Sequence, residues 1–178
     1  MNPEDPKPRV VLIGPMGAGK TTVARLLAGR WGVLVRDTDH DIERSDGRSI
    51  ADIFVEDGED HFRALERHAV ARALTEHDGV LALGGGAVLA QETRELLTGH
   101  TVVFLRVGLA AAVKRVGLGT GRPMLLGNVR SRVKALLDER TPIYESVATI
   151  SVDTDDRSPE DVAAEVARAV ELSVEERG

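Results

Sequence analysis

The sequence contains no cysteine among its 178 residues. Disulfide bonds, thiol catalysis and cysteine-ligated metal sites are therefore excluded, and a reducing environment suits the chain, so we expect a cytoplasmic protein. Aromatic residues make up only 3% of the chain. Few aromatic residues, an acidic surface and the lack of an apolar stripe on the predicted helices together favour a monomer.

Long hydrophobic runs and an excess of positive charge are also missing. No run approaches the roughly 18 apolar residues that a membrane helix needs, and residues 1–9 are too polar for a signal peptide. The formal net charge of −6 at pH 7 argues against sequence-independent binding of nucleic acid, which requires a basic face. We therefore expect no membrane or nucleic-acid partner, and we expect a local cluster of Arg and Lys to hold any anionic ligand.

The stretch Gly14–Thr22, GPMGAGKTT, matches the pattern G-x-x-x-x-G-K-[ST]. A short β-branched run precedes it and a helix-periodic run follows it, which is the context of a phosphate-binding loop. Backbone N–H groups of such a loop surround the phosphates, Lys20 reaches the β- and γ-phosphates, and the Thr21 hydroxyl binds Mg²⁺. The alternative is a glycine turn that happens to precede a lysine, and the flanking patterns argue against it.

Apolar runs alternate with helical patterns along the whole chain, whose length fits one domain over 1–178. This order predicts an α/β fold with three layers, α/β/α, around a five-stranded parallel sheet. The predicted strands are Arg9–Ile13, Val33–Arg36, Val80–Leu83, Thr101–Arg106 and Thr149–Val152. The predicted helices are Thr21–Trp31, Glu59–Glu76, Leu109–Val116, Val129–Glu139 and Glu160–Val174. Ligands of such a sheet bind beyond the carboxyl ends of its strands.

Two carboxylates follow the second predicted strand, in the sequence Arg36-Asp37-Thr38-Asp39. Residues two apart in an extended segment point the same way, so Asp37 and Asp39 would both face the phosphate loop. One carboxylate can hold Mg²⁺, directly or through water, and the other can accept a proton from a substrate hydroxyl. Alternatively, one of the pair caps the helical stretch His40–Ser45, which Asp39 precedes, but capping does not explain both.

Two glycine-rich segments follow other strands. Gly84, Gly85 and Gly86 would let a backbone pass close to a ligand and offer N–H groups to it, although a flexible turn is the alternative. In the segment 114–123, three glycines and Arg122-Pro123 would break the preceding helix into a mobile loop. Arg122 on such a loop can close over a transferring phosphoryl group, and a plain helix–helix linker is the alternative.

Two further arginines lie on predicted helices. Arg63 has Glu66 three residues later, and on its own this pattern favours a solvated ion pair. Pro142 would end the helix that precedes it, which leaves Arg140 near a helix C-terminus, where a cation also interacts favourably with the helix dipole. Together with the phosphate loop, the carboxylates and the glycines, these arginines can seat a nucleotide and Mg²⁺ beside a small anionic molecule that carries hydroxyl groups.

The order of these motifs closely resembles that of the shikimate kinase family, a group of nucleoside-monophosphate-kinase-like P-loop NTPases. The resemblance runs from about Val10 to the last helix. It rests on the following segments: GPMGAGKTT at the phosphate loop, DTD at Asp37–Asp39, GRSIADIF at Gly47–Phe54, DGEDHFRALE at Asp57–Glu66, LGGGA at Leu83–Ala87, GRPML at Gly121–Leu125 and RTPIYE at Arg140–Glu145.

The resemblance implies transfer of the ATP γ-phosphate to the 3-hydroxyl of shikimate, on the route to chorismate and the aromatic amino acids. It implies that Asp39 binds the shikimate hydroxyls and acts as the base, that Lys20 and Arg122 assist catalysis, and that shikimate-binding helices (about 39–66) and a lid (about 117–129) flank the site. The implied ATP-binding residues are Gly14, Pro15, Met16, Gly17, Ala18, Gly19, Lys20, Thr21, Thr22, Arg115 and Arg122, with Arg115 against the adenine. The implied shikimate-binding residues are Asp39, Phe54, Phe62, Arg63, Gly84, Gly85, Gly86 and Arg140, and the implied Mg²⁺ residues are Thr21 and Asp37.

Two other functions remain possible at this stage. The chain could be a kinase for another small hydroxy acid, such as gluconate, which the pair of arginines and the three glycines disfavour. It could also be a nucleotide-binding switch that hydrolyses ATP slowly to change partners. ATPase activity that stays low without an acceptor and rises on addition of shikimate would distinguish the enzyme from the switch.

Overall fold

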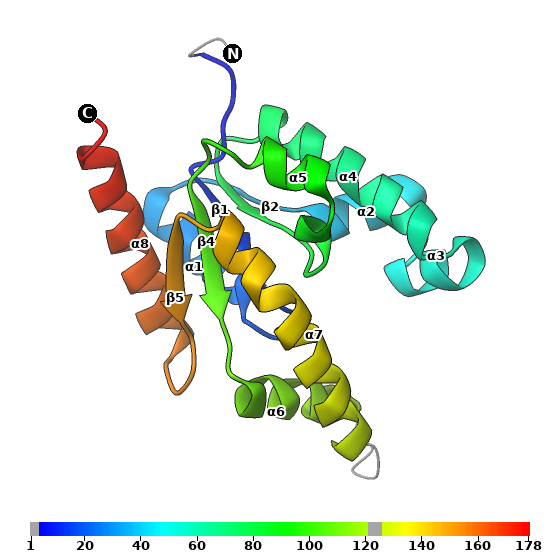
Figure 1. The fold of residues 1–178 in the computed structure, drawn as a ribbon. Coiled ribbons are helices and arrows are strands. Elements are labelled where there is room, and N and C mark those ends of the chain that lie inside the picture. Colours follow the sequence, from blue (N-terminus) through cyan, green and yellow to red (C-terminus); the bar gives the residue numbers. More distant parts are fainter. Residues whose placement is uncertain (1–3, 121–125) are drawn as a thin grey trace.

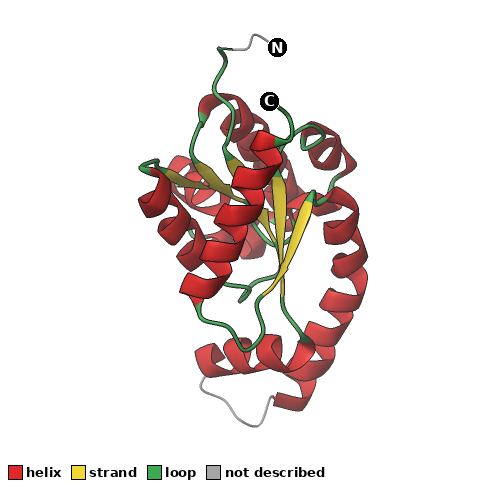
Figure 2. Ribbon diagram, turned by 90° about the vertical axis from the view of Figure 1, so that its left-hand side faces the viewer, coloured by secondary structure: helices red, strands yellow, loops and turns green. Residues whose placement is uncertain are grey.

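The computed structural model describes residues 4–120 and 126–178, and within these residues the strands form one five-stranded parallel sheet (Figures 1 and 2). The sheet has the order β2-β3-β1-β4-β5. Its strands are β1 (Val10–Ile13), β2 (Val35–Asp37), β3 (Val80–Ala82), β4 (Val102–Arg106) and β5 (Ile150–Asp153). Helices cover both faces of the sheet (Figure 2). The predicted fold class is confirmed.

The sheet is apolar on both faces because each central strand sends successive side chains to opposite sides. In β1, Val10 and Leu12 pack into one core cluster, whereas Val11 and Ile13 pack into the other. The β1 side chains are at most 1% exposed. This double burial explains why the strands read as continuous apolar runs rather than as alternating ones.

Helices α1 (Lys20–Trp31) and α8 (Pro159–Glu175) cover one face of the sheet. The C-terminal parts of α4 (Glu59–Glu76) and α7 (Leu126–Val147) cover the other face. Among the helices in 4–120 and 126–178, none is long and apolar enough to cross a membrane.

Short helices lie outside the five predicted helices, although the sequence already indicated one of them through the helical stretch His40–Ser45. They are α2 (Thr38–Asp46), α3 (Ile50–Asp57), the 3-10 helix η1 (Ala87–Leu89) and α5 (Gln91–Leu96). Elements of this length contain too few turns to show a clear apolar period. Helices α2 and α3 pack on the N-terminal half of α4 through a small cluster of their own, which contains Ile42, Ile53 and Phe62.

The prediction that Pro142 ends its helix is wrong, because α7 continues through Pro142 to Val147. A proline inside a helix removes one backbone hydrogen bond and costs about 3 kcal/mol. The following turn buries Tyr144 completely, with its ring 5.0 Å from that of Phe104, and this burial offsets the cost. Arg140 therefore lies two turns before the helix end, and an interaction with the helix dipole no longer explains it.

The predicted loop from Gly117 onward is also partly wrong. Helix α6 runs from Leu109 to Thr120, through Gly117, and α7 begins at Leu126. Tertiary packing of α6 against α7 overrides the low helix propensity of glycine. Both helices project beyond the carboxyl ends of the strands (Figure 1).

Candidate active site

The loop between β1 and α1 has the strand–turn–helix form that the sequence predicts. Gly14, Gly17 and Gly19 have φ angles of 148°, 83° and 90°, values that side chains with a Cβ rarely adopt. A Cβ on Gly14 would also lie 2.8 Å from the carbonyl oxygen of Leu105. The glycines let the loop curl over the N-terminus of α1, where free N–H groups and the helix dipole favour a bound anion.

Lys20, the first residue of α1, folds back over this loop. Its Nζ donates hydrogen bonds to the carbonyl oxygens of Gly14 at 2.6 Å and Pro15 at 3.0 Å. Burial lowers the pKa of Lys20 to about 8, and the negative charges of Asp39 and Asp37 oppose this shift. The ammonium group therefore lies in the field of both carboxylates and can exchange its carbonyl partners for phosphate oxygens.

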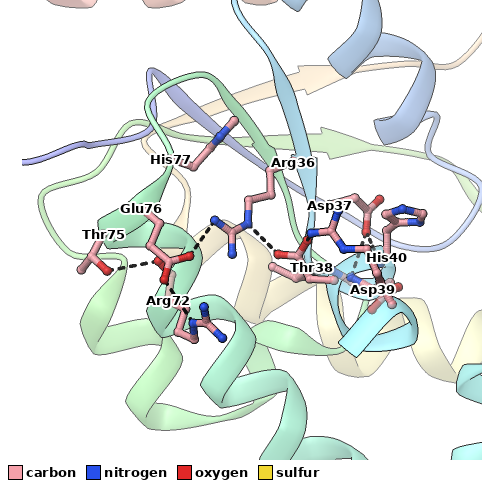
Figure 3. Close-up of polar contacts among 12 residues, drawn as sticks. Arg36, Asp37, Thr38, Asp39, His40, Arg72, Thr75, Glu76 and His77 are labelled. Carbon is pink, nitrogen blue, oxygen red and sulfur yellow. Dashed lines mark hydrogen bonds and ion pairs between the residues drawn. The ribbon is translucent and has the colours of Figure 1, made fainter. Parts of the chain in front are cut away.

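Asp37 and Asp39 adopt different positions, and the expectation that both lie on one extended segment is wrong. Asp37 ends β2 and caps α2, with its Oδ1 accepting hydrogen bonds from the backbone N–H groups of Asp39 at 2.8 Å and His40 at 3.3 Å (Figure 3). Asp39 is thus inside the first turn of α2 rather than its cap. Helix capping therefore accounts for the carboxylate of Asp37 but not for the carboxylate of Asp39.

Asp39 is the more perturbed of the two carboxylates. Burial raises its pKa to about 6, the charges of Asp37 and Glu66 add to the shift, and Lys20 opposes it. A carboxylate whose pKa lies near neutrality is both ionised at pH 7 and basic enough to take up a proton. The carboxylate of Asp39 therefore has the basicity that a proton acceptor needs.

The three glycines after β3 bring a separate functional group close to the backbone at each position. A Cβ on Gly84 would lie 2.5 Å from Oδ1 of Asp39, and one on Gly86 would overlap the guanidinium group of Arg63. A Cβ on Gly85 would lie 3.5 Å from the backbone nitrogen of Met16 and 3.7 Å from Nη1 of Arg140. This segment, which we call the glycine shelf, is a close-approach surface rather than a flexible turn.

A buried hydrogen bond holds the shelf in place. The hydroxyl group of Tyr144 on α7 donates to the carbonyl oxygen of Gly85 at 2.5 Å. The hydroxyl group of Thr38, which is fully buried, accepts a hydrogen bond from the N–H group of Gly84 at 3.3 Å. The shelf is therefore tied to α7 on one side and to the turn that carries Asp39 on the other.

Arg63 and Arg140 approach the shelf from different helices, and the buried carboxylate of Glu66 lies in the field of both guanidinium groups. Nη1 of Arg63 donates to Oε1 of Glu66 at 2.8 Å, and these side chains are only 19% and 4% exposed. The pair is not the solvated one that the sequence favours. The buried Nε of Arg140 has no hydrogen-bond partner among the described residues. Both guanidinium groups are positioned to receive a further anion.

Glu66 is a site residue that sequence reasoning missed. Its burial raises the pKa of its carboxyl group, although Arg63 and Arg140 lower it. The sequence contains a signal for the burial of Glu66, which lies four residues after Phe62. Phe62 is only 3% exposed, so this spacing places both side chains on the inner side of α4. Reading Glu66 only as the ion-pair partner of Arg63 overlooked that position.

A cavity of about 510 Å³ joins these groups, and we call it the acceptor cavity. Its polar lining includes Asp39, Arg63, Glu66 and Arg140, and its apolar lining includes Phe54. The rings of Phe54 and Phe62 lie 4.8 Å apart. Phe62 also lines the cavity, but it packs into the small core cluster, so it has a structural role as well. The cavity opens toward Pro15 and Met16 of the phosphate loop, so donor and acceptor would meet at that loop.

A second cavity of about 280 Å³ lies on the other side of the phosphate loop. It is lined by Gly17, Ala18, Gly19, Thr22, Val23, Arg115, Thr154, Arg157, Pro159 and Val162. A guanidinium nitrogen of Arg115 donates a hydrogen bond to the carbonyl oxygen of Gly17. The sequence indicated Arg115 only through the family resemblance, and it missed Thr154, Arg157 and Pro159. The signal for these three was their position after the last strand, at the same edge of the sheet.

The residues expected to hold Mg²⁺ fit a shared site with the nucleotide. Thr21 is exposed at the start of α1, and Asp37 lies near Lys20. Among the described residues, no cluster of three or more Asp, Glu or His side chains could hold a metal ion on its own. Mg²⁺ commonly binds through few protein groups together with substrate phosphates and waters, and Thr21 and Asp37 suit that arrangement. Arg122 lies outside the described residues.

Known proteins are similar to this chain in sequence and in fold over most of its length. The family model for shikimate kinase matches residues 16–171. The shikimate kinase of Thermobifida fusca is 59% identical over 91% of this chain and 94% of that protein, and that of Salinispora arenicola is 59% identical over 90% of this chain and 96% of that protein. The structure of shikimate kinase from Acinetobacter baumannii in complex with shikimate superposes with a TM-score of 0.86 at 34% identity, covering 94% of each chain.

A more distant similarity concerns the fold alone. A gluconokinase structure from Sinorhizobium meliloti has a TM-score of 0.58 at 20% identity, and it covers 95% of this chain and 97% of that one. The shikimate kinases differ from this general likeness by their higher identities, 34% to 59% against 20%, and by the higher TM-score of 0.86 against 0.58. The chain therefore belongs to the shikimate kinase family.

Proposed function

We propose that this chain transfers the γ-phosphate of ATP to the 3-hydroxyl of shikimate, and that the acceptor cavity is where the transfer occurs. One observation carries the proposal: a single cavity is lined by Asp39, by Arg63 and Arg140, and by Pro15 and Met16 of the phosphate loop. Phosphoryl transfer needs positioning and charge neutralisation more than covalent chemistry. The cavity supplies both, with an anion-binding loop at one side and a carboxylate-binding pair at the other.

Arg63 and Arg140 bind the carboxylate of the acceptor. Guanidinium groups form paired hydrogen bonds to carboxylates, and such bonds are strong when the site is shielded from water. Nη1 of Arg63 donates a hydrogen bond to Oε1 of Glu66 at 2.8 Å, which fixes the position of Arg63. Nε of Arg140 has no partner among the described residues, so it can donate to the acceptor carboxylate. A ring acid anchored in this way presents its hydroxyl groups to Asp39 and its body to Phe54 and the glycine shelf.

Asp39 hydrogen-bonds the acceptor hydroxyl and takes its proton as the new P–O bond forms. The leaving group is ADP, which carries away the electrons of the broken P–O bond. Because the pKa of Asp39 is raised to about 6, its carboxylate is mostly ionised at pH 7 and is still basic enough to accept the hydroxyl proton. Lys20 remains a cation below its own pKa of about 8 and neutralises charge on the β- and γ-phosphates.

The nucleotide lies across the phosphate loop, with its triphosphate over Gly14–Thr22 and its base in the second cavity. Arg115 forms one wall of that cavity, and its planar guanidinium can stack on an adenine ring. Mg²⁺, when bound, neutralises phosphate charge and orients the γ-phosphate, and Thr21 and Asp37 would hold it. Arg122, which lies outside the described residues, remains our candidate for the lid arginine that neutralises phosphate charge.

A coupled assay of ADP release tests this function. We expect low ADP release with ATP and Mg²⁺ alone, a large increase with shikimate and little increase with gluconate. Mass spectrometry would identify shikimate 3-phosphate as the product. An equal response to gluconate, or ADP release that does not depend on any acceptor, would contradict the proposal.

We further infer that the chain works as a monomer in the cytoplasm. Its net charge of −6 and its few aromatic residues disfavour a stable apolar interface, and the absence of cysteine suits a reducing compartment. Size-exclusion chromatography with light scattering tests the first point, and a mass of about twice 19.1 kDa would contradict it.

A further inference from the structure

Arg36, the residue directly before Asp37, joins the three elements β2, α2 and α4 (Figure 3). From β2 its Nε donates to Oδ2 of Asp41 in the first turn of α2 at 2.6 Å. Its Nη1 lies 3.0 Å from Oε2 of Glu76, the last residue of α4. Glu76 also accepts a hydrogen bond from Nε of Arg72 at 3.1 Å. Arg36 thus links the first turn of α2, which carries Asp39, to the C-terminal end of α4.

The Arg36–Asp41 contact is shielded from solvent, unlike most ion pairs among residues 4–120 and 126–178. The two side chains are 22% and 13% exposed. For comparison, the side chains of the Lys134–Asp138 pair are 60% and 64% exposed. Exposed pairs contribute little, whereas removing one partner of a shielded pair leaves the other charge poorly solvated. The Arg36–Asp41 pair can therefore resist displacement of α2.

The turn between β2 and α2 needs such a restraint. Strand β2 has only three residues and lies at the edge of the sheet, so its backbone pairs with one neighbour. The cap by Asp37 and the 3.3 Å contact between Thr38 and Gly84 hold the turn locally. These two contacts involve residues 37 to 40 and Gly84, so the part of the first turn that follows His40 depends on other contacts. Asp41, two residues after Asp39, supplies a third attachment point on the far side.

We propose that Arg36 is a positioning residue, which fixes the orientation of Asp39 by holding Asp41 against β2 and the end of α4. This inference rests on the proposed role of Asp39 as the base. Arg36 itself does not line the acceptor cavity. Its effect is transmitted through the first turn of α2, and displacement of a catalytic group by about 1 Å can cost up to about 10²-fold in rate.

The test compares Arg36→Gln and Asp41→Asn with the control Arg72→Gln. The first two variants break the contact between β2 and α2, while the control breaks only the exposed contact to Glu76. We expect kcat to fall about tenfold in both test variants, with the KM for ATP within about twofold of the parent value. Arg36→Lys keeps the charge without the planar fork, so it should recover only part of kcat. The control should keep its kcat.

A double-mutant cycle separates positioning from a general loss of structure. In an Asp39→Asn background the carboxylate is already absent, so Arg36→Gln should lower kcat no further. Circular dichroism melting curves and the KM for ATP report whether each variant is folded. Normal kcat in a folded Arg36→Gln variant, an equal loss in the Arg72→Gln control, or losses that multiply in the double variant would each overturn the inference. If Asp39→Asn alone keeps normal turnover, the proposed role of Asp39 fails instead.

Discussion

The phosphate loop and the acceptor-binding side of the site face the same cavity, but they are built in different ways. The phosphate loop takes its groups from one stretch, Gly14–Thr22, between β1 and α1. The acceptor side takes its groups from α2, α4, the glycine shelf and α7, which are far apart in the chain. The loop depends on local backbone conformation, whereas the acceptor side depends on packing between elements.

This difference predicts that the two sides can be altered separately. Under the proposed function, the phosphates would depend on N–H groups and on Lys20 from the loop between β1 and α1, and the base would depend on the second cavity with Arg115. Acceptor binding and proton transfer would depend on α2, α4 and α7 keeping their relative positions. Changes on the acceptor side should therefore affect kcat or the acceptor KM and leave ATP binding nearly intact, and the following experiments test that separation.

The largest effect is expected for Asp39→Asn. Removing the base should lower kcat by at least about 10²-fold, with ATP affinity unchanged when it is measured by titration calorimetry. Asp60→Asn is a suitable control, because Asp60 is an exposed residue in the first turn of α4. Near-normal turnover of Asp39→Asn would remove Asp39 from the catalytic role.

Arg63→Ala should raise the KM for the acceptor by about 10- to 10²-fold, because a charge-assisted contact to the carboxylate is lost. It should also lower stability, because Glu66 would remain buried without Arg63. Adding Glu66→Gln should restore much of the stability without restoring the KM. Equal losses of ATP and acceptor affinity would contradict the proposed separation of the two sides.

The pH dependence should differ between the two sides. At saturating ATP and Mg²⁺, kcat/KM for the acceptor should fall as pH drops through about 6, because Asp39 becomes protonated. ATP affinity of the acceptor-free enzyme should instead weaken as pH rises through about 8, because Lys20 loses its proton. The Asp39→Asn variant should lose the acid limb of the first profile. An unchanged acid limb in that variant would show that another group causes it.

The smallest effect is expected for Gly86→Ala. The backbone of Gly86, with φ −102° and ψ 4°, is accessible to alanine, so the main consequence is displacement of the Arg63 guanidinium group by the new Cβ. Losing about 1 kcal/mol of contact energy corresponds to a rise of about three- to tenfold in the acceptor KM. Gly29→Ala, on an exposed part of α1 with no atom within 4 Å of the new Cβ, is the matched control. A rise in the KM for ATP, with the acceptor KM unchanged, would instead indicate that the glycine shelf contributes to nucleotide binding.

The acceptor side shows where sequence reasoning reached its limit. Asp39, Arg63 and Arg140 were identified as residues of the right chemical type, but nothing local to each one indicated that they share a cavity. Taken together with the phosphate loop they predicted a common site, but the role of each residue in that site came from the family resemblance. The sequence favoured a solvated Glu66, and only the packed structure shows that it is buried, with 3% exposure. Pro142 was read as a helix end, because the burial of Tyr144 in the next turn is not visible in the sequence.

The sequence by itself determined the parallel sheet and the phosphate loop, because both follow from local patterns. Runs of apolar residues specify strands that are buried on two faces, and glycines at fixed spacing specify the φ angles of the loop. Only the tertiary structure decided which carboxylate caps α2, which one remains free, and how Arg36 and Glu66 are paired. These outcomes depend on burial and on distances between elements, and such quantities exist only once the helices have packed on the sheet.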